Sequence, residues 1–106
     1  MSAHLGAHNR AHVVTAKAAL VGLTKAIAVE YADRGVVANC IVPGKIGGER
    51  SRSAGESATM AGGAGPIVGR LGTVDEVAAL VRQLCVPASR YVTGQTIHLS
   101  GGMFMA

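Results

Sequence analysis

The chain has 106 residues, enough for one small domain around one core, and 49% of them are apolar, which excludes an intrinsically disordered protein. Its net charge of +4 comes from scattered basic residues with no aromatic platforms between them, so we expect no nucleic-acid partner. Cys40 and Cys85 stand in apolar runs at a spacing that suits neither a metal site nor a disulfide, and no signal-peptide pattern occurs, so we predict buried free thiols in a cytoplasmic protein.

A long helix is the first predicted element. Residues 1–11 are expected to form a loop, and the helix then runs from about His12 to Arg34, with Gly35 placed as a left-handed C-cap. Apolar residues occupy almost all sides of this helix rather than one stripe. Such a pattern is typical of a helix that is buried on more than one side.

The second cover for this helix is predicted to be another copy of the chain. The helix is long enough to span a bilayer, but Lys17, Lys25 and Glu30 interrupt it, so we expect no membrane insertion. One side could face a sheet, and a partner subunit is the natural cover for the other. We therefore predict a homo-oligomer through residues 12–34.

The remaining elements alternate between strand and helix. Residues 36–42, VVANCIV, are β-branched and apolar and predict a fully buried strand of a parallel sheet. Residues 45–70 are rich in Gly, Ser and Arg and predict a long functional loop. Thr73 and Glu76 form a capping box at the start of a helix that ends before Pro87, and TIHL follows as a strand. The order helix, strand, loop, helix, strand predicts a parallel crossover in an open α/β sheet.

Two features could carry chemistry. Lys17 is either a lysine whose stem covers apolar surface or an ammonium held at an active site, where it could orient a ribose hydroxyl and favour the charged form of a neighbouring acid. Pro43 and Gly44 end a strand, and ligands of open α/β sheets bind outside such strand ends, with glycine allowing a ligand to approach the backbone. An ordinary strand-ending turn is the alternative interpretation.

The histidines predict no metal site. His4, His8 and His12 follow one another at four-residue spacing, but Gly6 and Asn9 disfavour a helix there, and no carboxylate or thiol joins them. No glycine-rich phosphate loop follows a strand either.

Three blocks taken together resemble a known family: TAKAALVGLTKAIAVEYADRGVVANCIVPGKI, GRLGTVDEVAALVRQLC and RYVTGQTIHLSGG. In order and spacing they resemble the C-terminal part of a short-chain dehydrogenase/reductase, most of all the 3-oxoacyl-acyl-carrier-protein reductase-like branch. The resemblance runs from about Gly6 to Gly102. It implies the C-terminal portion of a Rossmann-type, doubly wound parallel sheet, as a single partial domain over residues 1–106. The implied activity is hydride transfer between NAD or NADP and a carbonyl or alcohol, with a small-molecule carbonyl or acyl thioester as the implied substrate.

The resemblance also assigns residues. Lys17 matches the lysine of the family's Tyr-x-x-x-Lys motif, which binds the nicotinamide ribose and helps to lower the pKa of the tyrosine. Pro43, Gly44 and Ile46 match the Pro-Gly-x-Ile segment that lies along the nicotinamide, and Asn39 matches the asparagine before it. Residues 45–70 match the variable substrate loop.

The departures from the family pattern are specific. Val13 occupies the position of the catalytic tyrosine, four residues before Lys17, and cannot donate a proton. His12 is the alternative acid, but it lies one position off that register and is expected to point away from Lys17 unless the helix starts after it. Gly48 replaces a cofactor-contacting threonine, and the family's catalytic serine would fall before Met1.

Two functional hypotheses follow. In the first, the chain is a C-terminal fragment of an oxidoreductase and is inactive alone, because the dinucleotide-binding half has no counterpart here. In the second, it is a non-catalytic remnant that acts as an oligomerisation or interaction module. Either way we expect marginal stability and exposed apolar surface.

Overall fold

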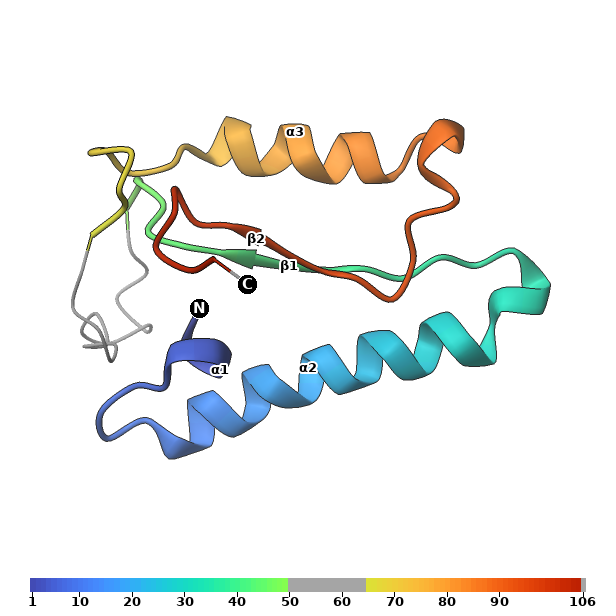
Figure 1. Ribbon diagram of the computed structural model, residues 1–106, viewed down its shortest axis with the longest axis horizontal. Coiled ribbons are helices and arrows are strands. Elements are labelled where there is room, and N and C mark those ends of the chain that lie inside the picture. Colours follow the sequence, from blue (N-terminus) through green and yellow to red (C-terminus); the bar gives the residue numbers. More distant parts are fainter. Residues whose placement is uncertain (50–64, 106) are drawn as a thin grey trace.

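The computed structural model describes residues 1–49 and 65–105 of the chain. A short two-stranded sheet lies between two helices, with α2 on one side and α3 on the other (Figure 1). Residues near the two ends of the described chain lie together, since the rings of His4 and Phe104 have centroids 5.3 Å apart. The helices and strands are α1 (Ser2–Leu5), α2 (Ala11–Glu30), β1 (Cys40–Pro43), α3 (Val74–Leu84) and β2 (Thr96–Leu99), with 3₁₀ turns η1 (Ala32–Arg34) and η3 (Pro87–Ser89).

The two strands are parallel, which confirms the predicted α/β class. Cys40 lies opposite Thr96, and Pro43 lies opposite Leu99. The predicted strand over residues 36–42 is wrong at its start, because pairing begins only at Cys40. The residues just before β1 are instead tied to the turn that leads into β2: the Ala38 N–H donates to the Thr93 hydroxyl at 3.1 Å.

The predicted bounds of the first helix also need correction. Residues 2–5, expected in a loop, form the short helix α1. Helix α2 ends at Glu30 rather than Arg34, because the Arg34 N–H bonds to the Tyr31 carbonyl and tightens the chain into the turn η1. Gly35 then adopts the predicted left-handed conformation, with φ 70°.

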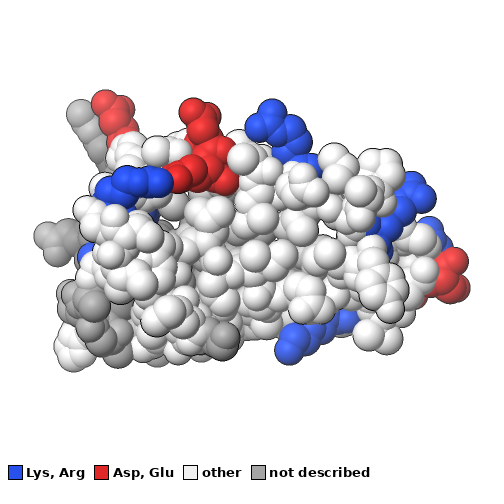
Figure 2. Space-filling view, turned by 45° about the horizontal axis from the view of Figure 1, so that its top comes forward, with Lys and Arg blue, Asp and Glu red and all other residues white. Residues whose placement is uncertain are grey.

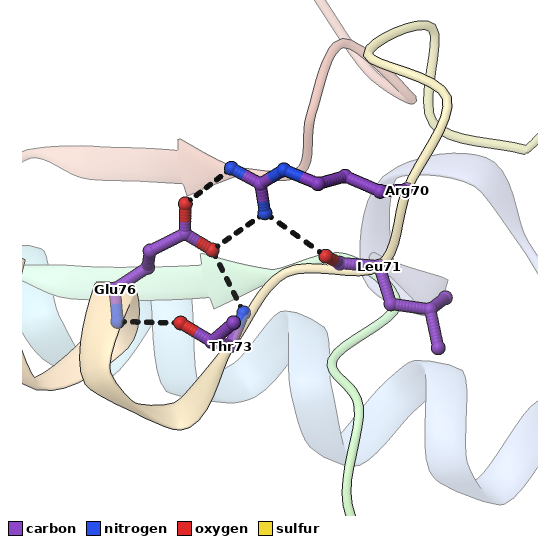
Figure 3. Close-up of polar contacts among 4 residues, drawn as sticks. All are labelled: Arg70, Leu71, Thr73 and Glu76. Atoms are coloured by element: carbon purple, nitrogen blue, oxygen red, sulfur yellow. Dashed lines mark hydrogen bonds and ion pairs between the residues drawn. The ribbon is translucent and has the colours of Figure 1, made fainter.

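Helix α3 begins as predicted. The Thr73 hydroxyl accepts from the Glu76 N–H at 3.1 Å, and the Glu76 carboxylate accepts from the Thr73 N–H at 2.8 Å, which completes the capping box (Figure 3). The cysteines are free thiols, as predicted, but neither is buried: Cys40 is half-buried and Cys85, just after α3, is exposed.

The core is thin. Among the described residues, the buried hydrophobic side chains are Ala28 of α2 and Val42 of β1, each 7% exposed. The prediction of a fully buried strand is wrong: Val42 is buried, but Cys40 and Ile41 are half-buried and Pro43 is exposed. Within the described residues, β1 pairs with β2 alone. Large apolar side chains such as Leu23, Val29 and Val81 are exposed, as expected. In Figure 2 the charged side chains lie along the borders, and a broad uncharged surface separates them.

Candidate functional site

Lys17 and Pro43 line one cavity, of about 210 Å³, between the first turns of α2 and the end of β1. The α1 segment closes the cavity from the other side with Met1 and Ser2, and Cys40 contributes from β1. The structure therefore brings together the lysine and the proline that the sequence singled out. Helix α2 positions the first, and the parallel pairing of β1 positions the second.

The Lys17 ammonium brings a positive charge to the lining of this cavity. Burial lowers the pKa of the Met1 amino group, and the positive charge of Lys17 lowers it further. A cavity with this charge favours lone-pair donors such as hydroxyl or anionic oxygens over a cationic group.

The position that would give Lys17 an acidic partner is occupied by a hydrocarbon. Val13 is half-buried in α2, one helical turn before Lys17. His12 lies inside the same helix, since α2 begins at Ala11, and it stands five positions before Lys17. Side chains at that separation point about 140° apart around a helix, and His12 is exposed. The geometry does not bring the imidazole of His12 and the ammonium of Lys17 to one side.

Gly44 is needed for contact between the strands. Its N–H donates to the Leu99 carbonyl at 2.9 Å. A Cβ at this position would lie 2.8 Å from the Cα of Ser100. The glycine at this strand end therefore admits the backbone of the chain itself, whereas the sequence suggested that it admits a ligand.

Ile46 lies apart from Lys17. It pairs with Gly72 in an isolated parallel bridge, and it lines a second cavity of about 380 Å³ together with Glu76 and Leu99. The structure therefore divides the predicted cofactor-contacting segment between two cavities. Of the predicted loop over residues 45–70, residues 50–64 lie outside the described part of the chain.

Glu76, beside the second cavity, is held as a carboxylate. Arg70 donates to its two oxygens at 2.6 and 3.0 Å (Figure 3). The hydrogen bond from Arg70, and then that from the Thr73 backbone, lower the pKa of Glu76 to about 2. Glu76 is therefore ionised at neutral pH, which suits a capping residue and not a proton donor.

The structure gives two residues near the candidate site a place that the sequence did not predict. Ser2 lines the Lys17 cavity, although the spacing between Ser2 and Lys17 in the sequence matches no motif that would have indicated it. Asn39, which resemblance had marked without a role, donates to the Val92 carbonyl at 2.8 Å and accepts from the Gln95 N–H at 3.1 Å. These two hydrogen bonds hold the segment just before β1 against the segment just before β2.

His8 and His12 are exposed, whereas His4 and His98 are half-buried. His4 and His98 form an edge-on ring pair with centroids 4.5 Å apart, and Phe104 packs 4.4 Å from His98. Within residues 1–49 and 65–105, no group of three or more His, Cys, Asp or Glu side chains is arranged to hold a metal ion.

Helix α2 is long and apolar enough to cross a membrane, judged by length and composition. Core helices of soluble proteins meet the same criterion, so the predicted absence of membrane insertion stays a prediction.

Comparison with known proteins gives a consistent set of relatives. Residues 1–104 match the family model described as enoyl-(acyl carrier protein) reductase. The chain is 38% identical over 101 residues to a 3-oxoacyl-[acyl-carrier-protein] reductase of Vibrio cholerae, covering 95% of this chain and 41% of the relative. It is 35% identical to the short-chain reductase protein NovJ of Streptomyces niveus, covering 92% of this chain and 40% of the relative.

Solved structures agree. The acetoin dehydrogenase YohF of Salmonella typhimurium superposes with a TM-score of 0.76 at 31% identity, over 98% of this chain and 40% of that one. A short-chain dehydrogenase of Bacillus anthracis gives 0.68 at 33% identity, over 90% of this chain and 36% of that one. The chain thus spans about two fifths of the length of the relatives it matches.

Proposed function

Because the chain belongs to the short-chain dehydrogenase/reductase family, we propose that it forms one side of an NAD(P)-dependent carbonyl oxidoreductase and that it catalyses no reaction alone. The observation that carries the proposal is the shared cavity of Lys17 and Pro43, which are the family-matched residues on α2 and β1. The chain matches about two fifths of its relatives, so the rest of such a site would come from residues outside this matched part.

The described residues do not fit a whole nicotinamide dinucleotide. The Lys17 cavity, of about 210 Å³, is smaller than the sites of about 300 Å³ or more that hold small ligands. Ile46, expected along the nicotinamide, lines a different cavity.

The chain's own residues would bind and orient a ligand that carries hydroxyl or anionic oxygens. The Lys17 ammonium can donate hydrogen bonds to hydroxyl or anionic oxygens in the cavity that it lines. Val13 offers no proton, so a proton donor would have to come from another position. The names of the relatives suggest a 3-oxoacyl thioester as the class of substrate. The free thiols are consistent with the proposed cytoplasmic location.

The first test uses the chain alone. Fluorescence titration with NADPH is expected to show no saturable binding up to high micromolar concentrations, and acetoacetyl-coenzyme A is expected to remain unreduced. An affinity in the micromolar range or tighter would contradict the proposal that the chain is incomplete as a cofactor site.

The second test adds the part of a relative that this chain does not match. The chain is co-expressed with the segment of the Vibrio cholerae relative that it does not match, and NADPH binding to the purified assembly is measured. We expect binding that weakens when Lys17→Met removes the ammonium, while Lys25→Met on the same helix serves as a matched control. An assembly that forms but binds no NADPH would overturn the proposed oxidoreductase role.

A second candidate function is a non-catalytic interaction module. Val13 at the tyrosine position is the observation that favours it. In the same assembly, Val13→Tyr separates the two functions. If only the Val13→Tyr variant reduces acetoacetyl-coenzyme A, the natural chain lacks the proton donor but retains the other residues that the reaction needs from it. Turnover by the unmodified assembly would instead show a different proton donor, with His12→Ala as the next variant to measure.

A further inference from the structure

We propose that a groove between α2 and α3 binds a medium-chain aliphatic carboxylate, with the hydrocarbon chain along the groove and the carboxylate at Arg90. The groove has a volume of about 590 Å³, which is larger than either cavity described above and lies within the range of sites that hold small ligands. Lys17 and Ile46 do not line it, so the proposal does not rest on the proposed oxidoreductase role.

The walls of the groove are hydrocarbon. Helix α2 contributes Leu20, Leu23 and Ile27, and α3 contributes Val81 and Leu84. The segment that leads into β1 passes between the two helices and also lines the groove (Figure 1). Leu23 is 55% exposed and Val81 is 44% exposed, so the walls still present apolar surface to water. A ligand that covers this surface gains the free energy of removing it from water.

The amide and hydroxyl side chains of the lining are already engaged within the chain. The Thr24 hydroxyl donates to the Leu20 carbonyl at 2.8 Å. Asn39 donates to the Val92 carbonyl and accepts from the Gln95 N–H. The groove therefore favours an aliphatic ligand over a sugar or a peptide, since the polar groups of those ligands would be left unpaired against its walls.

Arg90 supplies the charge of the groove. Among the described residues that line the groove, it is the one with a charged side chain. It is exposed, and no ion pair holds it within the described part of the chain. A guanidinium presents planar N–H donors that match the two oxygens of a carboxylate. The single cation beside apolar walls therefore selects an anionic head group on an aliphatic chain.

The first measurement is isothermal titration calorimetry of the full chain with dodecanoate, below the concentration at which dodecanoate forms micelles. We expect a dissociation constant in the micromolar range, and binding about tenfold weaker for decanoate and weaker again for octanoate, because each buried pair of CH₂ groups contributes about that factor. Dodecyltrimethylammonium has the same chain with the opposite charge and should bind about tenfold more weakly than dodecanoate. Binding that is independent of chain length or of head-group charge would overturn the proposal.

Two substitutions separate the contributions of the head group and the chain. Arg90→Gln should weaken dodecanoate binding about tenfold and leave dodecanol binding unchanged, with the exposed Arg82→Gln of α3, outside the groove, as the matched control. Leu23→Glu places a carboxylate in the groove and should abolish binding, whereas Leu71→Glu, at a residue of similar exposure outside the groove, should not. Far-UV circular dichroism establishes that each variant keeps its helices. Equal effects of a variant and its control would contradict the assignment of the groove.

The two free thiols report where the ligand binds. Cys85 lines the groove, whereas Cys40 lines the Lys17 cavity. Saturating dodecanoate should slow the alkylation of Cys85 by iodoacetamide and leave the rate at Cys40 unchanged, as measured by mass spectrometry of the two peptides. It should also raise the urea midpoint, because a ligand that binds the folded chain stabilises it. Equal protection of both thiols, or a lowered midpoint, would show that dodecanoate coats or unfolds the chain and would refute specific binding.

A second copy of the chain and a lipid surface are the competing occupants of the groove. Sedimentation equilibrium tests the first: a dimer of the unmodified chain that Leu23→Glu dissociates would assign the groove to the homo-oligomer predicted from the sequence. Vesicle flotation tests the second: binding to phosphatidylglycerol vesicles without binding to monomeric dodecanoate would assign the groove to a membrane. Either result would overturn the proposal.

Discussion

Gly44 shows how one residue determines the shape of the candidate site. Its missing side chain lets β1 approach the residue after β2, and this approach places Pro43 at the cavity that Lys17 lines. The Pro-Gly pair was recognisable from the sequence as a strand end. That the space beside the glycine is filled by Ser100 depends on the pairing of two strands more than 50 residues apart, which no local pattern encodes.

Gly44→Ala tests this contact. The added methyl would lie 2.8 Å from the Cα of Ser100, so the strand ends must separate. We expect a loss of stability of about 1–3 kcal/mol, as for other overpacked positions. Urea unfolding followed by circular dichroism measures it. Gly65→Ala, where the added Cβ meets nothing within 4 Å, is the matched control, and equal effects of the two substitutions would contradict the argument.

Asn39 gives the second prediction for a single residue. Asn39→Ala would remove its hydrogen bonds to Val92 and Gln95 and would leave the carbonyl in the part-buried contact and the exposed Gln95 N–H without this partner. We expect a loss of about 1–3 kcal/mol in the free energy of unfolding. Asn39→Asp keeps the acceptor but not the donor, so its unfolding midpoint should fall between those of the alanine variant and the natural chain. Midpoints identical for all three would show that the residue acts through something other than these bonds.

Among the elements, α3 is the one whose start could be predicted most closely. A capping box is a local pattern of two side chains and two backbone groups, and Thr73 and Glu76 form it as expected. The bounds of α2 and β1 could not be predicted as well. The end of α2 depends on how the chain turns after Tyr31, and the start of β1 depends on the turn at residues 92–95, which holds the preceding residues out of the sheet.

The start of α3 should weaken in acid. The pKa of Glu76 is about 2 in the folded chain, against an ordinary value near 4.5. The unfolded chain therefore takes up the proton first, and the contribution of Glu76 to stability is present above about pH 4.5 and is lost as the pH falls toward 2. Unfolding midpoints measured between pH 6 and 3 should fall for the natural chain and change less for Glu76→Gln.

Thr73→Ala is the companion variant for this element. It removes the hydroxyl that accepts from the Glu76 N–H and should cost about 1 kcal/mol at neutral pH, as for other N-caps. Thr73→Ser keeps the hydroxyl and should retain most of the stability. If the alanine and serine variants unfold alike, the hydroxyl does not act as the cap.

For the whole molecule, the site is more divided than the sequence suggested. The fold class and the parallel sheet were predictable because the order of elements and the strand patterns are local. The separation of Lys17 and Ile46 into two cavities was not, because it depends on how α1 packs beside α2 and how Ile46 pairs with Gly72. The family motif specifies which residue types occur in which order. It does not specify how far apart their side chains lie in a chain that spans only part of the relatives' length.

The ring cluster of His4, His98 and Phe104 joins the beginning of the chain to its end, beside β2. Buried nitrogens of both histidines, Nε2 of His4 and Nδ1 of His98, have no hydrogen-bond partner, so the cluster tolerates neutral rings better than charged ones. Burial lowers the pKa of His98, and the neighbouring His4 and the Met1 amino group lower it further.

This cluster should make the whole chain less stable in mild acid. Because the folded form of His98 resists protonation, stability is complete above the ordinary histidine pKa of about 6.5 and is lost as the pH falls below it. The urea midpoint should therefore be lower at pH 5.5 than at pH 7.5. His98→Phe keeps a ring against Phe104 without a titrating group and should reduce this difference, whereas substitution of the exposed His8 by alanine should not. A difference that is as large in His98→Phe as in the natural chain would place the acid sensitivity elsewhere.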